Sequence, residues 1–92
     1  MITALVLINA DRKRIPETAE ALLAIDGVRE VFSVTGDYDL VVTVRLKEYA
    51  QLAAVVTERM AELDAITRTH TMLAFRCFSR ADIEQGFSIG VE

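Results

Sequence analysis

Runs of apolar residues at two different spacings divide the chain into alternating strands and helices. A nearly continuous apolar run of strand length extends from Ile2 to Ala10. From about Asp11 to Ala24, the apolar positions follow the spacing of an amphipathic helix: Ile15, Ala19, Leu22 and Leu23. Pro16 is compatible only with the start of that helix, and Asp26-Gly27 marks its end.

The same alternation continues through the rest of the chain. A second strand is predicted from Val28 to Val34, a turn from Thr35 to Tyr38, and a third strand from Asp39 to Leu46. Lys47 to Leu63 is predicted to be helical, with one apolar face formed by Leu52, Val56, Met60 and Leu63. A last, long strand is predicted from Ile66 to Phe78.

The order of these elements predicts an α+β fold. Two right-handed βαβ units joined by a hairpin give a ferredoxin-like βαββαβ sandwich, a four-stranded antiparallel sheet with two helices on one face. The first and third strands are the most continuously apolar and are expected at the centre. The second strand carries Arg29 and Glu30, and the fourth carries Arg68 and His70, as edge strands would.

The central strands are apolar on both faces, although two helices cover only one face of such a sheet. In the first strand, Leu5 and Leu7 point to one face of the sheet, and Ala4, Val6 and Ile8 point to the other. In the third strand, Val41 points to the face opposite to that of the other apolar residues, Leu40, Val42, Val44 and Leu46. A second copy of the sheet, packed about a two-fold axis, would cover the other face. We therefore expect a dimer formed through this face.

Length and composition fit one domain. The chain has 92 residues, of which 52% are hydrophobic, and we place the domain at residues 1–78. The tail, residues 79–92, begins with the spacing of a capping box at Ser79 and predicts a short helix ending near Gly86. Phe87 and Ile89 in the tail have two interpretations, docking on their own domain or anchoring a neighbouring subunit.

Charge and cysteine content exclude several classes of function. The net charge of −4 and the lack of a reading helix argue against direct DNA binding. No apolar run of about 18 residues and no signal peptide appears, so the chain is expected to be cytoplasmic, with no membrane partner. Cys77 is the single cysteine and is expected to be a small buried hydrophobic residue.

Catalytic and metal-binding patterns are scarce. His70 is the lone histidine and has no nearby nucleophile motif or second metal ligand. Asp37 and Asp39 lie two residues apart around a turn, and nothing in the sequence separates their pKa values for acid and base roles. We therefore expect no enzyme activity, no metal and no cofactor.

The turn between the second and third strands is more polar than a hairpin requires. Gly36 allows a positive φ and a close approach of the backbone to a ligand, and Thr35 offers hydrogen bonds. Asp37 or Asp39 can receive an ammonium group. These groups suit a free amino acid. An ordinary polar turn built from Asp and Gly explains the same composition, so the residues alone leave both interpretations open.

Two motifs in the chain resemble a known family. The run from Val28 to Leu40 contains the V-x-G-x-x-D pattern of Val34, Gly36 and Asp39, and Ile66 to Thr71 follows the pattern V-x-R-T-x-T with Ile in place of Val. Together they resemble the C-terminal ligand-binding (RAM) domain of the Lrp/AsnC family of transcription regulators, over about residues 1–78. The helix-turn-helix of that family is not seen, so the chain is similar to stand-alone RAM proteins.

The resemblance implies sheet-to-sheet dimers that associate into rings, commonly octamers, and an amino-acid effector bound between dimers. Carried over by position, one wall of the pocket comprises Ser33, Thr35, Gly36, Asp37, Tyr38 and Asp39. The other wall, from a neighbour's fourth strand, comprises Thr69, Thr71 and Met72. Full-length Lrp/AsnC regulators are implied as further partners.

Two functions are compatible with these observations. The first is an amino-acid-binding oligomeric module that modulates transcription regulators by ligand-dependent assembly. The second is an enzyme of the dimeric α+β barrel type, which shares the topology and acts on small organic substrates. Such an enzyme needs polar groups between helices and sheet, where this sequence places Leu, Val and Ala.

Overall fold

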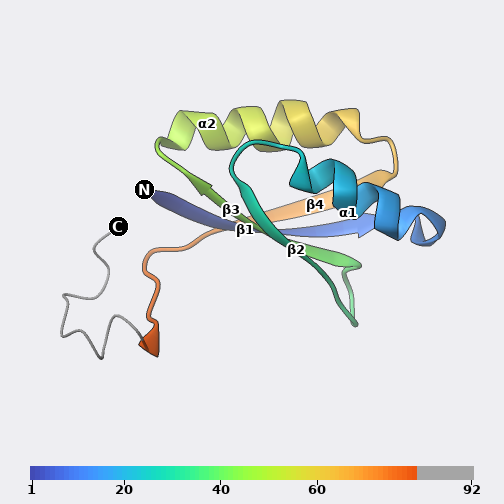
Figure 1. The fold of residues 1–92 in the computed structure, drawn as a ribbon, viewed down its shortest axis with the longest axis horizontal. Helices are drawn as coiled ribbons and strands as arrows, with labels where there is room; N and C mark the ends of the chain where they lie inside the picture. Colours follow the sequence, from blue (N-terminus) through green and yellow to red (C-terminus); the bar gives the residue numbers. More distant parts are fainter. Residues whose placement is uncertain (81–92) are drawn as a thin grey trace.

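The structure is a computed structural model that describes residues 1–80. It contains one four-stranded sheet in the order β2-β3-β1-β4, with every neighbouring pair antiparallel. The strands are β1 (Ile2–Ala10), β2 (Val28–Ser33), β3 (Leu40–Leu46) and β4 (Ile66–Leu73). Both helical runs lie on the same side of the sheet (Figure 1). The predicted ferredoxin-like fold, with the first and third strands at the centre, is confirmed.

The helices begin where the sequence provides capping groups. After β1, a 3-10 turn η1 (Arg12–Arg14) leads into α1 (Ile15–Leu23), and Asp11 caps the turn by accepting the Lys13 N–H at 3.0 Å. The second run comprises α2 (Tyr49–Ala53), η2 (Ala54–Arg59) and η3 (Met60–Glu62). It starts with a capping box between Glu48 and Gln51. No helix within residues 1–80 has the length and apolar character needed to cross a bilayer.

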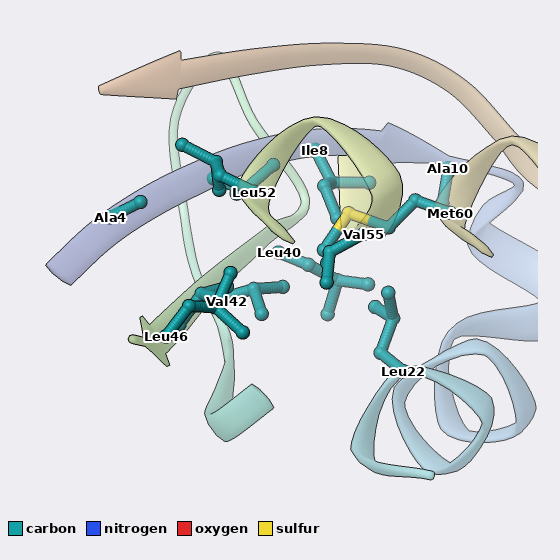
Figure 2. Packing of buried hydrophobic residues seen from close by; sticks show 12 residues of the cluster. Ala4, Ile8, Ala10, Leu22, Leu40, Val42, Leu46, Leu52, Val55 and Met60 are labelled. Carbon is teal, nitrogen blue, oxygen red and sulfur yellow. The ribbon is translucent and has the colours of Figure 1, made fainter. Parts of the chain in front are cut away.

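The core lies between the helices and the two central strands (Figure 2). Alternate residues of β1 and β3 are buried, as strand geometry requires. They pack against Leu22 of α1 and against Leu52, Val55 and Met60 of the second helical run. The buried strand residues are Ala4, Val6, Ile8, Ala10, Leu40, Val42, Val44 and Leu46.

The apolar face predicted for the first helix is partly wrong. Leu22 is fully buried, but Leu23 is 50% exposed and Thr18 is buried in its place. Thr18 and Leu22 lie one turn apart and therefore face the sheet together, whereas Leu23 points about 100° away. The Thr18 hydroxyl donates to the Arg14 carbonyl at 2.6 Å, which allows this polar side chain to be buried.

The second helical run also differs from the regular α-helix that the spacing predicts. Its middle segment, η2, is a π-helix. Val56 is half-buried and packs against the core, but Val55, which the predicted apolar face omits, is the more deeply buried of the two. The wider π turn explains the change, because it brings Val55 and Met60, five residues apart, onto the same face.

The fourth strand is shorter than predicted, ending at Leu73 rather than Phe78. Leu73 pairs with Ala4, and the Ala74 N–H still donates to the Thr3 carbonyl at 2.9 Å. The ladder between β1 and β4 ends there, although β1 itself continues to Ile2 and pairs with β3. Cys77 is half-buried rather than buried. Most of the helix predicted to end near Gly86 lies outside the described residues, as do Phe87 and Ile89.

The second face of the sheet is not covered by any described part of the chain. We call it the uncovered face. Its apolar members are Leu5, Leu7, Phe32, Val41 and Met72, since directly opposed residues of an antiparallel pair share a face. Phe32 is 47% exposed and Met72 is 42% exposed. The uncovered face is therefore an exposed apolar surface in a single chain.

Candidate functional site

The connection between β2 and β3 is a tight turn that projects beyond the sheet (Figure 1). The Val34 N–H donates to the Asp39 carbonyl at 3.0 Å, and the Asp39 N–H donates to the Ile8 carbonyl at 2.8 Å. Gly36 has a φ of +105°, and a Cβ built at this position would meet nothing within 4 Å. The turn thus needs glycine for its backbone conformation and presents open space around it.

Asp39 fixes the turn to the end of β1. Its Oδ2 accepts the Ala10 N–H at 2.9 Å, and its Oδ1 lies 3.6 Å from the Arg12 Nε. The Ala10 N–H, with smaller contributions from the Asn9 side chain and Arg12, lowers the pKa of Asp39 against the opposing effect of burial. One carboxylate oxygen is therefore held firmly and the other only loosely, since the Arg12 side chain is 88% exposed.

Asp37 is placed differently from Asp39. The Asp37 backbone carbonyl accepts a hydrogen bond from the Asn9 side-chain Nδ2–H at 2.8 Å, and the residue as a whole is exposed. Within the described residues, no ion pair or hydrogen bond involves its carboxylate. The backbone of Asp37 is held, and its charge is solvated.

A hollow of about 320 Å³ lies beside the turn. It contains one carboxylate, Asp39, and one guanidinium, Arg12, and the remaining lining is a mixture of turn backbone, hydroxyls and apolar side chains. The lining residues are Arg12, Ile15, Ser33, Val34, Thr35, Gly36, Tyr38 and Asp39. The hollow therefore offers both charges that a zwitterionic ligand requires.

Most residues predicted for the first wall of the ligand pocket line this hollow, and none of those predicted for the second wall does. Asp37 is the one turn residue of the predicted set that does not line the hollow. Thr69 and Thr71 pair with Ile8 and Val6 and share the helix side of the sheet, whereas Met72 pairs with Leu5 on the uncovered face. All three residues are exposed on the edge strand β4, and none of them lines the hollow of its own chain.

Sequence reasoning missed three residues of this region. From the local pattern, Arg12 is a solvated residue at a helix start and Ile15 is part of the apolar face of that helix. Their place in the hollow could not be predicted, because the sequence does not show that η1 passes beside the turn. Asn9 was not singled out, although a polar residue at the end of an apolar strand was a usable signal.

No group of three His, Cys, Asp or Glu side chains suited to a metal occurs within residues 1–80.

The family of the chain follows from its sequence profile, in agreement with the fold. The sequence profile described as the Lrp/AsnC ligand binding domain matches residues 3–82, so the chain belongs to this family. The resemblance noted in the two motifs is confirmed.

Relatives and solved structures support the same assignment. The HTH-type transcriptional regulator FL11 of Pyrococcus furiosus is 31% identical over 75 residues, which cover 82% of this chain and 49% of FL11. The chain thus spans about half the length of this curated relative. TTHA0845 from Thermus thermophilus is 48% identical, with a TM-score of 0.80 over 87% of this chain and 100% of that one.

A more distant structure shares the fold alone. It is the complex of transcriptional regulator NMB0573 from Neisseria meningitidis with L-Met, which is 11% identical and has a TM-score of 0.72. The alignment covers 79% of this chain and 49% of that one.

Proposed function

We propose that this chain binds a free amino acid at the turn between β2 and β3 and acts as an oligomeric module in Lrp/AsnC-type regulation. The observation that carries the proposal is the pairing of charges in the hollow, where Asp39 Oδ1 and Arg12 Nε lie 3.6 Å apart. An amino acid entering the hollow would exchange this loose pair for two charge-assisted contacts. The family description and the L-Met bound to NMB0573 support the same class of ligand.

Each end of the ligand has a candidate partner in the hollow. The ammonium group is assigned to Asp39, whose Oδ1 is the less engaged oxygen. The carboxylate is assigned to Arg12 and to the backbone near Gly36, where open space allows close approach. Ser33, Thr35 and Tyr38 complete the first wall. Asp37, which does not line the hollow, contributes to the field around it rather than to direct contact.

Assembly completes the proposed pocket. Dimers form through the uncovered face, where Phe32 and Met72 are exposed. Association of dimers into a ring, of which an octamer is one form, would bring Thr69 and Thr71 of a neighbouring copy to the second wall, whereas Met72, on the uncovered face, would belong to the dimer interface. Ligand binding and ring formation are then linked, and co-assembly with full-length regulators would carry the signal to DNA.

The interior of the domain supports this proposal over an enzyme of the α+β barrel type. Of the buried residues in the described part of the chain, only Thr18 is polar, and its hydroxyl is bonded to the backbone. A reaction between helices and sheet would have no acid or base available there. FL11, the curated relative reported above, is named a transcriptional regulator.

A thermal-shift screen against the twenty amino acids tests the proposal. Binding to the folded state raises the melting temperature as ligand exceeds its dissociation constant, so one amino acid or a related few should shift it by several degrees. The same compounds as decarboxylated amines, which lack the group assigned to Arg12, should give no shift. If the amines shift the melting temperature equally, the zwitterion assignment is wrong.

A further inference from the structure

A cluster of side chains from β4 holds Tyr38 of the turn. The Arg68 guanidinium carbon lies 5.2 Å from the centroid of the Tyr38 ring, within the range of a cation–π contact. The His70 ring belongs to the same cluster, with its centroid 6.4 Å from that of Tyr38 and its plane tilted by 42°. Tyr38 is thus held by β4 while it also lines the hollow.

Asn9 joins the same cluster to the backbone of the turn. Its side-chain oxygen accepts the Arg68 Nε at 3.0 Å, and its side-chain nitrogen donates to the Asp37 carbonyl at 2.8 Å. Arg68 therefore reaches the turn by two routes, directly through the ring of Tyr38 and indirectly through the amide of Asn9. Residues from β1, β4 and the turn form one connected unit.

The ladder between β1 and β4 has an irregularity next to Arg68. Arg68 pairs with Asn9 and Ile66 pairs with Ala10, so Thr67 is an extra residue in the ladder. The Thr67 hydroxyl donates to the Asn9 carbonyl at 3.1 Å, which ties the extra residue to the same site. Arg68 itself keeps the regular register of the ladder, and as the direct partner of Asn9 it lies on the same face, beside the turn.

We propose that Arg68 is a positioning residue for the ligand turn, acting through Tyr38 and Asn9. This inference rests on the proposed ligand role of the turn. Arg68 does not line the hollow, so its effect on a ligand is indirect. By holding the Tyr38 ring directly and the Asp37 carbonyl through Asn9, it reduces the conformational freedom that the turn would lose when a ligand binds.

The position of Arg68 also connects two surfaces of the molecule. Arg68 and His70 are exposed on the uncovered face, opposite Asn9 and Leu7 of β1. A second copy on that face would lie against the same side chains that hold Tyr38. The proposed dimer interface and the proposed ligand turn would therefore share Arg68 as a common structural element.

The test uses Tyr38 as its own reporter. The chain contains no Trp and two Tyr residues, so a Tyr49→Phe background leaves Tyr38 as the only tyrosine, and Tyr49 lies exposed on α2. In that background, Arg68→Ala should lower the steady-state fluorescence anisotropy of Tyr38 in the absence of ligand. Arg68→Ala should also weaken binding of the amino acid found in the screen about tenfold. Arg68→Lys should recover only part of this lost affinity.

Arg29→Ala is the matched control, because Arg29 is an exposed arginine on the other edge strand, away from the turn. It should leave both the anisotropy and the affinity unchanged. A double-mutant cycle adds Asn9→Ala, and the effect of Arg68→Ala on affinity should be clearly smaller in that background than in the wild type.

The outcomes separate this inference from the proposed function. If no amino acid binds the wild type, the proposed function fails and the positioning role fails with it, even where Arg68→Ala frees Tyr38. If the wild type binds, unchanged anisotropy and affinity in Arg68→Ala overturn the positioning role alone. Fully additive effects of Arg68→Ala and Asn9→Ala on affinity also overturn it.

Discussion

At the scale of single residues, Asp39 combines a structural role with the binding role proposed for it. Its Oδ2 holds the Ala10 N–H at the end of β1, and its Oδ1 faces Arg12 across the hollow. The V-x-G-x-x-D pattern indicates a role for Asp39 in the turn. It does not indicate which carboxylate oxygen accepts the Ala10 N–H and which one faces Arg12. That division depends on η1 returning beside the turn, a tertiary contact that no local pattern encodes.

The lowered pKa of Asp39 predicts a specific dependence of stability on pH. Because the folded-state pKa lies below the reference value of 3.8, the stabilisation is fully present above that value and is lost as pH falls through the folded-state pKa. Asp39→Asn should therefore melt at a lower temperature than wild type at pH 7, and the difference should shrink below about pH 4.

Thermal melts between pH 2.5 and 7 measure this difference. Asp26→Asn, which changes an exposed aspartate in the loop between α1 and β2, is the matched control and should differ little from wild type throughout. A gap between Asp39→Asn and wild type that stays constant over this pH range would show that the carboxylate charge does not stabilise the turn.

At the scale of elements, the sequence predicted what periodicity and turn chemistry can specify. The strand from Ile2 to Ala10 has the same limits in the structure, and Gly36 adopts the positive φ that glycine allows. The sequence-based predictions are wrong where the structure of an element depends on contacts with other elements. The fourth strand stops at Leu73, where its pairing with β1 ends, and neither the π-helix nor the extra residue Thr67 has a periodic signal.

The π-helix makes a prediction about two neighbouring valines. Val55→Ala should lower the free energy of unfolding by about 2 kcal/mol, because it removes buried methyl groups and leaves a cavity. Val56→Ala, on a half-buried side chain, should cost clearly less. Urea unfolding of both variants measures the difference. The opposite order would show that the segment is a regular α-helix with Val56 inward.

At the scale of the whole molecule, the uncovered face predicts a dimer. Phe32→Glu places a charge in the proposed interface, where it would be desolvated, and should shift the protein toward monomer in sedimentation at micromolar concentration. Leu23→Glu is the matched control, since Leu23 is similarly exposed but lies on a helix, and it should not change the association. A wild type that sediments as a folded monomer would contradict the inference.

Calorimetric titration of the amino acid found in the screen tests the central claim most directly, namely that the turn and Arg12 bind the ligand. Arg12→Gln removes an 88% exposed side chain and should weaken binding by about 1.5 kcal/mol, roughly tenfold, with little effect on folding. Gly36→Ala should abolish binding, since a Cβ disfavours the positive φ and occupies the space of approach.

Two variants serve as controls in the same titration. Lys13→Gln changes the neighbouring exposed cation, and Asp37→Asn changes the aspartate outside the hollow. Both should bind within a factor of about three of wild type, as expected for groups that make no direct contact. If Arg12→Gln and Gly36→Ala bind as tightly as these controls, the hollow is not the ligand site and the account of the turn is contradicted.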